Sequence, residues 1–216
     1  MNEEKFNIFG SKKTNLLNEN GHSLFLKRLL SPSGQHGLKT FFLESFMNNM
    51  LGLSIDDNNE WFAQEWWVET EKEAGKGRVD LYIHSKDKKY SIIIENKIGA
   101  KDQESQLYRY WRNLIYSNVN NEKWKESKLV YLSPSGEKPS NKSLQIPTKD
   151  SLGKYYGFPK ELEKEIICIS YKRNTRTKSI SDWLDNCLKM REISKDKNPR
   201  LYYTLEQYKE WIDNYL

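Results

Sequence analysis

Two carboxylates and one amine form the most informative group of side chains in this sequence. Glu95 and Lys97 follow a β-branched run, Ile92 to Ile94, that is typical of a strand covered on both faces. Successive strand side chains alternate between faces, so Glu95 and Lys97 are expected on the same side of a sheet. Charges at the end of an apolar strand are costly to bury unless they are paired or bound to a metal. The alternative is a surface ion pair at the end of the strand.

Asp80 supplies the second carboxylate from the preceding apolar stretch. Alternation there predicts Val79, Leu81 and Ile83 on one face and Asp80 on the other. If the two strands pair as a hairpin, Asp80 comes beside Glu95 and the lysine. Two carboxylates and an amine at one edge of a sheet form a site for a hard cation, with a proton carrier beside it.

A helix is expected after this strand, from about Asp102 to Tyr116, with Asp102 as its N-cap. Gln106 lies one turn before Tyr110, so both side chains can face the site. The alternative is an ordinary amphipathic face that packs on the sheet. For Arg78, an ion pair with one of the carboxylates and a contact to a phosphate are equally good alternatives.

The remaining pattern predicts a mixed α/β domain built on a small sheet. A short helix is expected within residues 1–21 and a long loop over 136–164. Further helices are expected over about 22–30, 36–51, 179–191 and 205–216, and strands over about 61–70, 78–84, 90–98, 128–132 and 165–171.

Length and composition are consistent with one globular domain. The chain has 216 residues, of which 13% are aromatic, and this argues against disorder although 30% are charged. We expect a single domain over 1–216, with N-terminal helices in 1–60, a core in 61–135 and a C-terminal strand and helices in 136–216. The net charge of +5 is compatible with a polyanionic partner without being diagnostic. The basic segment 172–178 is either a phosphate contact or a solvated loop.

Cysteine usage and hydropathy indicate a soluble protein of a reducing compartment, the cytoplasm by default. Cys168 and Cys187 fall in an expected strand and an expected helix, so buried free thiols are favoured over a disulfide. His22, His36 and His84 lack the spacing of a zinc site. No segment has the apolar length of a signal core or a membrane span.

The sequence resembles the PD-(D/E)XK nuclease superfamily. Gly77, Arg78 and Asp80, the strand end Glu95-Asn96-Lys97, and the helix with Gln103, Gln106 and Tyr110 carry the resemblance. It is closest to an uncharacterised bacterial branch, which also shares His22-Ser23 and the segment 30–37. Together these motifs cover residues 19–110, about half of the chain. One departure is that valine, not proline, precedes Asp80.

The resemblance implies a restriction-endonuclease-like core and metal-dependent hydrolysis of phosphodiester bonds, in DNA rather than RNA. It implies a Mg²⁺ ion, with Mn²⁺ as a substitute, held by Asp80, Glu95 and the Asn96 carbonyl. Lys97 would orient or deprotonate the nucleophile, or stabilise the transition state, and Gln106 would position water or phosphate. Glu19 aligns with an acid that completes such sites, with Glu44 or Glu65 as alternatives.

The resemblance leaves two further points open. Many nucleases of this fold pair to cut both strands, so a homodimer is compatible with it. A nuclease fold that binds nucleic acid or a protein partner without cutting is the alternative function. The presence of all the expected site residues counts against this alternative.

Overall fold

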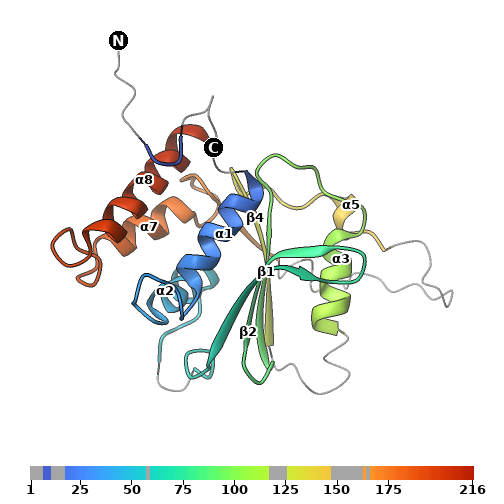
Figure 1. The fold of residues 1–216 in the computed structure, drawn as a ribbon. Helices are drawn as coiled ribbons and strands as arrows, with labels where there is room; N and C mark the ends of the chain where they lie inside the picture. Colours follow the sequence, from blue (N-terminus) through green and yellow to red (C-terminus); the bar gives the residue numbers. More distant parts are fainter. Residues whose placement is uncertain (1–6, 11–17, 57–58, 117–125, 147–162, 164–165) are drawn as a thin grey trace, which may run out of the picture.

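A five-stranded mixed sheet runs through the middle of the molecule, with helices on both faces (Figure 1). The structure, a computed structural model, describes residues 7–10, 18–56, 59–116, 126–146, 163 and 166–216. The strands are β1 (Trp66–Glu73), β2 (Arg78–Ser85), β3 (Tyr90–Asn96), β4 (Glu126–Ser133) and β5 (Ile167–Ser170), in that spatial order. The predicted α/β class is therefore confirmed.

The sheet changes from antiparallel to parallel at β3. Strands β1, β2 and β3 form an antiparallel meander, whereas β4 and β5 each run parallel to the preceding strand. All seven residues of β3 are buried, as its run of isoleucines predicted. Because β3 is central and covered on both faces, polar groups at its end are held in fixed positions.

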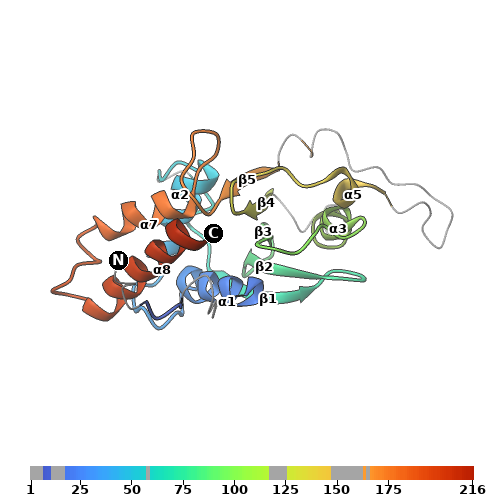
Figure 2. The ribbon, with the colours of Figure 1, turned by 90° about the horizontal axis from the view of Figure 1, so that it is seen from above.

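Helices cover the two faces unequally, as Figures 1 and 2 show. One face carries α1 (Glu19–Leu30), α2 (Phe41–Leu51), α7 (Ile180–Leu188) and α8 (Pro199–Tyr215). The other carries α3 (Gln106–Tyr110), its π-helical continuation η1 (Trp111–Tyr116) and α5 (Asn141–Leu144). Along β3, Ile92 and Ile94 pack in the first core and Ile93 in the second. Side chains beyond Ile94 therefore point alternately toward α1 and toward α3.

Two helix starts differ from the sequence prediction. Helix α2 begins at Phe41 rather than near His36, because His36 Nδ1 accepts the Leu38 N–H at 3.1 Å and holds residues 34–40 in turns. Helix α8 begins earlier than predicted, with Pro199 in its first turn, where a missing N–H costs nothing. The sequence had placed the start of this helix at about residue 205.

The helix after β3 is shorter and less regular than predicted. Ser105 precedes it with a φ of 54°, and the chain becomes π-helical from Trp111. Asp102 is not its N-cap. Its carboxylate instead accepts the Tyr131 hydroxyl at 2.9 Å and the Ser140 N–H at 2.6 Å, which ties the loop after β3 to β4 and to the start of α5.

The turn between β1 and β2 is shorter than predicted. Strand β1 starts at Trp66, five residues later than expected, and continues to Glu73, so the turn shrinks to 74–77. Alternation is interrupted near Asp80: Val79 packs in the second core, whereas Leu81 and Ile83 pack in the first. Opposite this point Glu71 has a φ of 56°. The irregular pairing leaves the Asp80 side chain at the site rather than in either core.

Smaller differences remain at other boundaries. Strand β5 and helix α7 are shorter than predicted, β4 is longer, and α5 lies within the predicted loop 136–164. Of residues 1–21, positions 7–10 form a turn and α1 starts at Glu19; the rest of that predicted helix lies mostly outside the described residues. Cys168 and Cys187 are free thiols; Cys187 is buried as predicted, whereas Cys168 is only partly buried. No helix in the described part of the chain is long and apolar enough to cross a membrane.

Candidate active site

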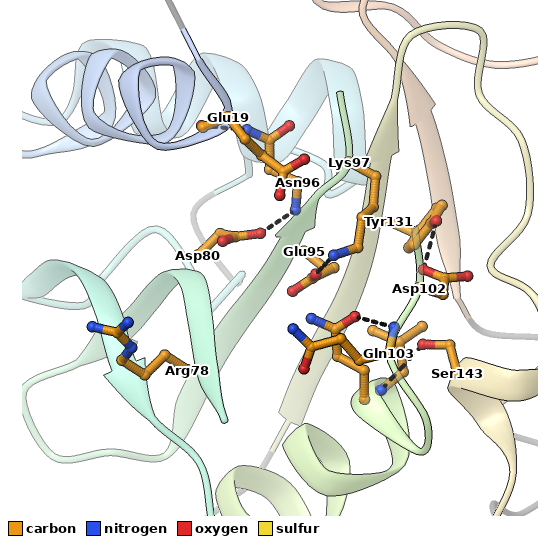
Figure 3. A network of polar contacts seen from close by, with 12 residues as sticks. Glu19, Arg78, Asp80, Glu95, Asn96, Lys97, Asp102, Gln103, Tyr131 and Ser143 are labelled. Carbon is orange, nitrogen blue, oxygen red and sulfur yellow. Dashed lines mark hydrogen bonds and ion pairs between the residues drawn. The ribbon is translucent and has the colours of Figure 1, made fainter. Parts of the chain in front are cut away.

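The predicted carboxylates and amine gather where β2 and β3 separate (Figure 3). The last backbone pair between these strands joins Leu81 to Ile94. Beyond it, the Asp80 carboxylate takes the place of a backbone acceptor, and its Oδ2 accepts the Asn96 N–H at 2.7 Å. Asp80 thus lies in the gap between β2 and β3, one residue beyond their last backbone pair.

Glu95 and Lys97 face α3 and contact each other directly. The Glu95 Oε1 and Lys97 Nζ atoms are 2.6 Å apart, and the two side chains are 1% and 8% exposed. An ion pair this deeply buried excludes the alternative of a solvated surface pair. The prediction that the two side chains lie on one side of the sheet is confirmed.

Burial leaves the Glu95 carboxylate short of partners. Among the described residues, neither of its oxygens accepts a hydrogen bond of good geometry, although Oε1 contacts the lysine. Burial, followed by the charge of Asp80, raises the pKa of Glu95 to about 8 despite the opposing effect of Lys97. Without a further positive charge, the Glu95 carboxyl therefore tends to keep its proton at neutral pH.

The pKa values of Asp80 and Lys97 are both raised, for different reasons. Burial raises the pKa of Asp80 to about 6, against the Asn96 N–H and Lys97, which lower it. Burial acts to lower the pKa of Lys97, but the surrounding carboxylates of Glu95, Glu19 and Asp80 outweigh it and raise the pKa above its ordinary value. Deprotonation of the nucleophile by Lys97 would need a lowered pKa, whereas the pKa of this side chain is raised. Lys97 therefore remains an ammonium.

Glu19 reaches the site from the first turn of α1. Its Oε2 accepts the Ile98 N–H at 3.0 Å, and its charge acts on both Asp80 and Lys97. Of the two alternatives, Glu65 forms an exposed ion pair with Lys86 at 2.9 Å, next to the opposite end of the hairpin. Glu44 lies in the first turn of α2. Glu19 is thus the acid that the structure brings to the site.

Gln106 lies at the start of α3 and is held by its neighbours. Its Nε2 donates to the Tyr110 hydroxyl at 2.9 Å, and its Oε1 accepts the Gln103 N–H at 3.3 Å. The Tyr110 hydroxyl donates to the Arg78 carbonyl at 2.6 Å and lies close enough to Glu95 for each to affect the pKa of the other. Gln106 is only 4% exposed, and its contacts with the described residues leave one amide N–H and one oxygen lone pair for a ligand.

Arg78 is not part of the buried group. Its side chain is 65% exposed and its Nε lies 3.3 Å from the Glu71 carboxylate. The structure thus pairs it with neither Asp80 nor Glu95. A contact to phosphate remains open to its exposed guanidinium.

Several side chains around the site were given no role in it by the sequence. Tyr131 lies beside Glu95 in the parallel register of β3 and β4 and holds Asp102. Ser23 and Tyr171 bind the Asn96 side chain. Alternation along β4 could have placed Tyr131 on the face of Glu95, but no local pattern indicates the partners of Asn96.

The donor set fits a divalent cation. Three carboxyl groups surround one ammonium, and even with Glu95 protonated the charges of Asp80 and Glu19 exceed that of Lys97, an excess that a cation would neutralise. Asp80, Glu95 and the Asn96 carbonyl provide oxygens, which hard cations such as Mg²⁺ prefer. Among the described residues, no three His, Cys, Asp or Glu side chains already form a cage.

The sheet topology, with a charged group where β2 and β3 separate, defines a class of protein: α/β proteins with a restriction-endonuclease-like core. A family model described as the PD-(D/E)XK nuclease superfamily matches residues 6–210, nearly the whole chain. The chain belongs to this superfamily, whose nucleases generally use divalent metals. No curated protein and no solved structure gives a match. The match extends well beyond residues 19–110, on which the resemblance in the sequence rested.

Proposed function

We propose that the protein is a Mg²⁺-dependent nuclease that cuts phosphodiester bonds within DNA. The observation that carries the proposal is the buried, under-neutralised pair of Asp80 and Glu95 beside the ammonium of Lys97. Such a charge arrangement is destabilising by itself, so a bound cation gives it a physical reason. Membership of the superfamily supports the nuclease activity.

Asp80, Glu95 and the Asn96 carbonyl would hold the cation, with Glu19 beside them. When bound, the cation would lower the pKa of a coordinated water and neutralise charge on the phosphate. Mn²⁺ would substitute for Mg²⁺, because both accept an octahedral set of oxygen ligands.

Lys97 would act as a charged donor. Its raised pKa favours orienting the nucleophile or stabilising the developing oxyanion over accepting a proton. Gln106 would position water or a phosphate oxygen with its remaining amide N–H and lone pair, since its other groups are bound to Tyr110 and Gln103.

The mildly basic chain supports nucleic acid as the substrate. Exposed Arg78 and the segment 172–178 are candidate phosphate contacts. Within that segment, however, Arg173 is paired with Asp182 at 3.0 Å and also with Asp185. Cutting both strands of a duplex requires two such sites, and we propose that a homodimer supplies them.

The test is cleavage of a panel of linear, circular, branched and single-stranded DNA and RNA, with Mg²⁺ or Mn²⁺ against EDTA. Wild type is compared with Lys97→Ala and, as a matched control, Lys86→Ala, which removes an exposed lysine. We expect cutting that requires both the metal and Lys97 and that is unaffected in the control. Cutting by a protein with Asp80, Glu95 and Lys97 all replaced by alanine would overturn the proposal. Silence on every substrate would favour the non-cutting alternative.

A further inference from the structure

We infer that a buried chain of polar side chains in mutual contact, from the C-terminal helix α8 to Asn96, positions the candidate cation site. Tyr171 and Tyr208 are then positioning residues for cation binding, although neither is placed to touch the ion. The inference rests on the proposed function, because it concerns the affinity of that same site. It gives the C-terminal part of the chain, outside the resemblance in the sequence, a role in the chemistry.

The side chain of Asn96 is the point at which the chain reaches the site. Its Nδ2 donates to the Glu19 carbonyl at 3.1 Å and to Ser23 Oγ at 3.0 Å, while its Oδ1 accepts the Tyr171 hydroxyl at 3.0 Å. A backbone carbonyl only accepts, so the orientation of the amide is fixed by these partners. Both N–H groups and the carbonyl oxygen are therefore engaged.

The backbone of Asn96 serves the cation site itself. Its N–H binds the Asp80 carboxylate at 2.7 Å, and its carbonyl is the third proposed cation ligand. The side chain binds the first turn of α1, from which Glu19 reaches the site. Fixing the Asn96 side chain therefore fixes two carboxylates and a carbonyl relative to one another.

The chain continues from Tyr171 into α8. The hydroxyls of Tyr171 and Tyr208 lie close enough for each to affect the pKa of the other, and Tyr208 Oη lies 2.8 Å from His22 Nδ1. Because Tyr171 donates its only proton to Asn96, its oxygen can only accept from Tyr208, and a Tyr208 that donates to it accepts from the Nδ1–H of His22. The order of donors is therefore set along the whole chain.

His22 maintains this order across the working pH range. Burial lowers its pKa to about 3, so the ring stays neutral, and its Nε2 has no hydrogen-bond partner among the described residues. The ring packs against Tyr171, Tyr208 and Trp211, with centroids 5.0–5.6 Å away. These contacts hold the imidazole in the orientation that presents Nδ1 to the chain.

Stability alone does not explain this chain. His22, Asn96, Tyr171 and Tyr208 are all completely buried. Apolar groups of similar shape often do as well there, since buried polar networks bring specificity of arrangement more surely than stability. The chain joins α1, the end of β3, the residue after β5 and α8, and it ends at the residue between Glu95 and Lys97. Its position thus indicates control of site geometry.

The experiment is titration of Mn²⁺ into the full-length protein by calorimetry, with free Mn²⁺ counted by electron paramagnetic resonance. Tyr171→Phe removes only the hydroxyl. Tyr90→Phe is the matched control, because Tyr90 is equally buried in β3 but its hydroxyl binds Glu60 at 2.5 Å, away from the site. We expect Tyr171→Phe to weaken Mn²⁺ binding about tenfold, the lower end for loss of an outer-sphere partner, and the control to leave it unchanged.

Tyr208→Phe separates positioning from general stability. It should weaken Mn²⁺ binding less than Tyr171→Phe, and adding it to Tyr171→Phe should have no further effect on affinity, because the chain is already broken. If Tyr171→Phe does not fold, Tyr208→Phe alone carries the test, and unchanged affinity in it overturns the inference.

Two failures can be told apart. Asp80→Asn should abolish specific Mn²⁺ binding. If wild type binds no Mn²⁺, or if Asp80→Asn binds it normally, the proposed function fails. If wild type binds Mn²⁺ through Asp80 and Tyr171→Phe binds it equally well, only the role of the chain is wrong.

Discussion

At the end of β3, the polar groups on the two faces of the sheet differ in how completely they are hydrogen-bonded. Toward α1, every polar group of the Asn96 side chain has a partner at 3.0–3.1 Å. Toward α3, the adjacent Glu95 has two buried oxygens that accept no well-formed hydrogen bond from the described residues, and its pKa is raised to about 8. Neighbouring residues thus belong to two different environments.

The difference separates structural support from chemistry. Hydrogen bonds on the α1 side fix the backbone, and they leave the charged groups on the α3 side without compensation. An unfavourable buried group of this kind persists when many other contacts fix the structure around it. A ligand of opposite charge removes the unfavourable electrostatic energy. We therefore expect substitutions on the two sides to have effects of different kinds.

The largest effect is expected on the α3 side. Glu95→Gln should lower metal-dependent cleavage at least about 10³-fold, because it removes a charged cation ligand. It should also stabilise the metal-free protein by about 1–3 kcal/mol, because it removes a buried, poorly paired carboxyl. Cleavage assays and urea unfolding in EDTA measure the two effects. Full activity, or a loss of stability, in Glu95→Gln would contradict the comparison.

On the α1 side, in contrast, a substitution should lower the free energy of unfolding. Asn96→Ala leaves the Tyr171 hydroxyl and the Ser23–Glu19 turn without a partner, so we expect a loss of about 3 kcal/mol in the free energy of unfolding. Urea unfolding in EDTA measures it. Asn48→Ala is the matched control, since that half-buried amide donates to the Leu53 carbonyl away from the site. Equal losses in both variants would mean that Asn96 has no special structural role.

The α3 side should also give the metal-free protein an unusual pH dependence. Folding raises the pKa of Glu95 from 4.5 to about 8 and that of Asp80 from 3.8 to about 6. The native state therefore binds more protons than the unfolded state between about pH 4 and 8, and stability should fall as pH rises through this window. Thermal unfolding in EDTA from pH 4 to 9 measures this trend, which should be weaker in Glu95→Gln. A stability that rises over this window, with the same slope in both proteins, would refute it.

The smallest effect is expected outside both environments. Arg78→Ala removes an exposed ion pair with Glu71, so the free energy of unfolding should change by less than about 0.5 kcal/mol. If Arg78 contacts a phosphate, the KM for nucleic acid should rise and its dependence on salt should weaken, with kcat unchanged. A large loss of kcat would place Arg78 within the site after all.

The α3 side was largely predictable from the sequence. The period of two along β3 places Glu95 and Lys97 on one face, and hairpin pairing brings Asp80 beside them. These are local rules, which work where a strand is regular. They failed at the break in alternation around Asp80 and at Asp102, because tertiary partners there override local propensity.

The α1 side could not be predicted in the same way. The Asn96–Tyr171 bond spans 75 positions and the His22–Tyr208 bond spans 186. Buried tyrosines and a histidine look like ordinary core residues in a sequence, and only the packing of α1 against α8 shows that their polar ends meet. The start of α8 was missed for a simpler reason: the helix was predicted from about residue 205, whereas it begins at Pro199, a residue that the first turn of a helix accepts.

The most direct test of the account is a crystal of the protein soaked in Mn²⁺, examined by anomalous diffraction at the manganese edge. We predict one strong anomalous peak bounded by the carboxylates of Asp80 and Glu95 and by the Asn96 carbonyl, and no such peak in crystals of Glu95→Gln. A fully occupied Mn²⁺ ion elsewhere, with none between Asp80 and Glu95, would contradict the account.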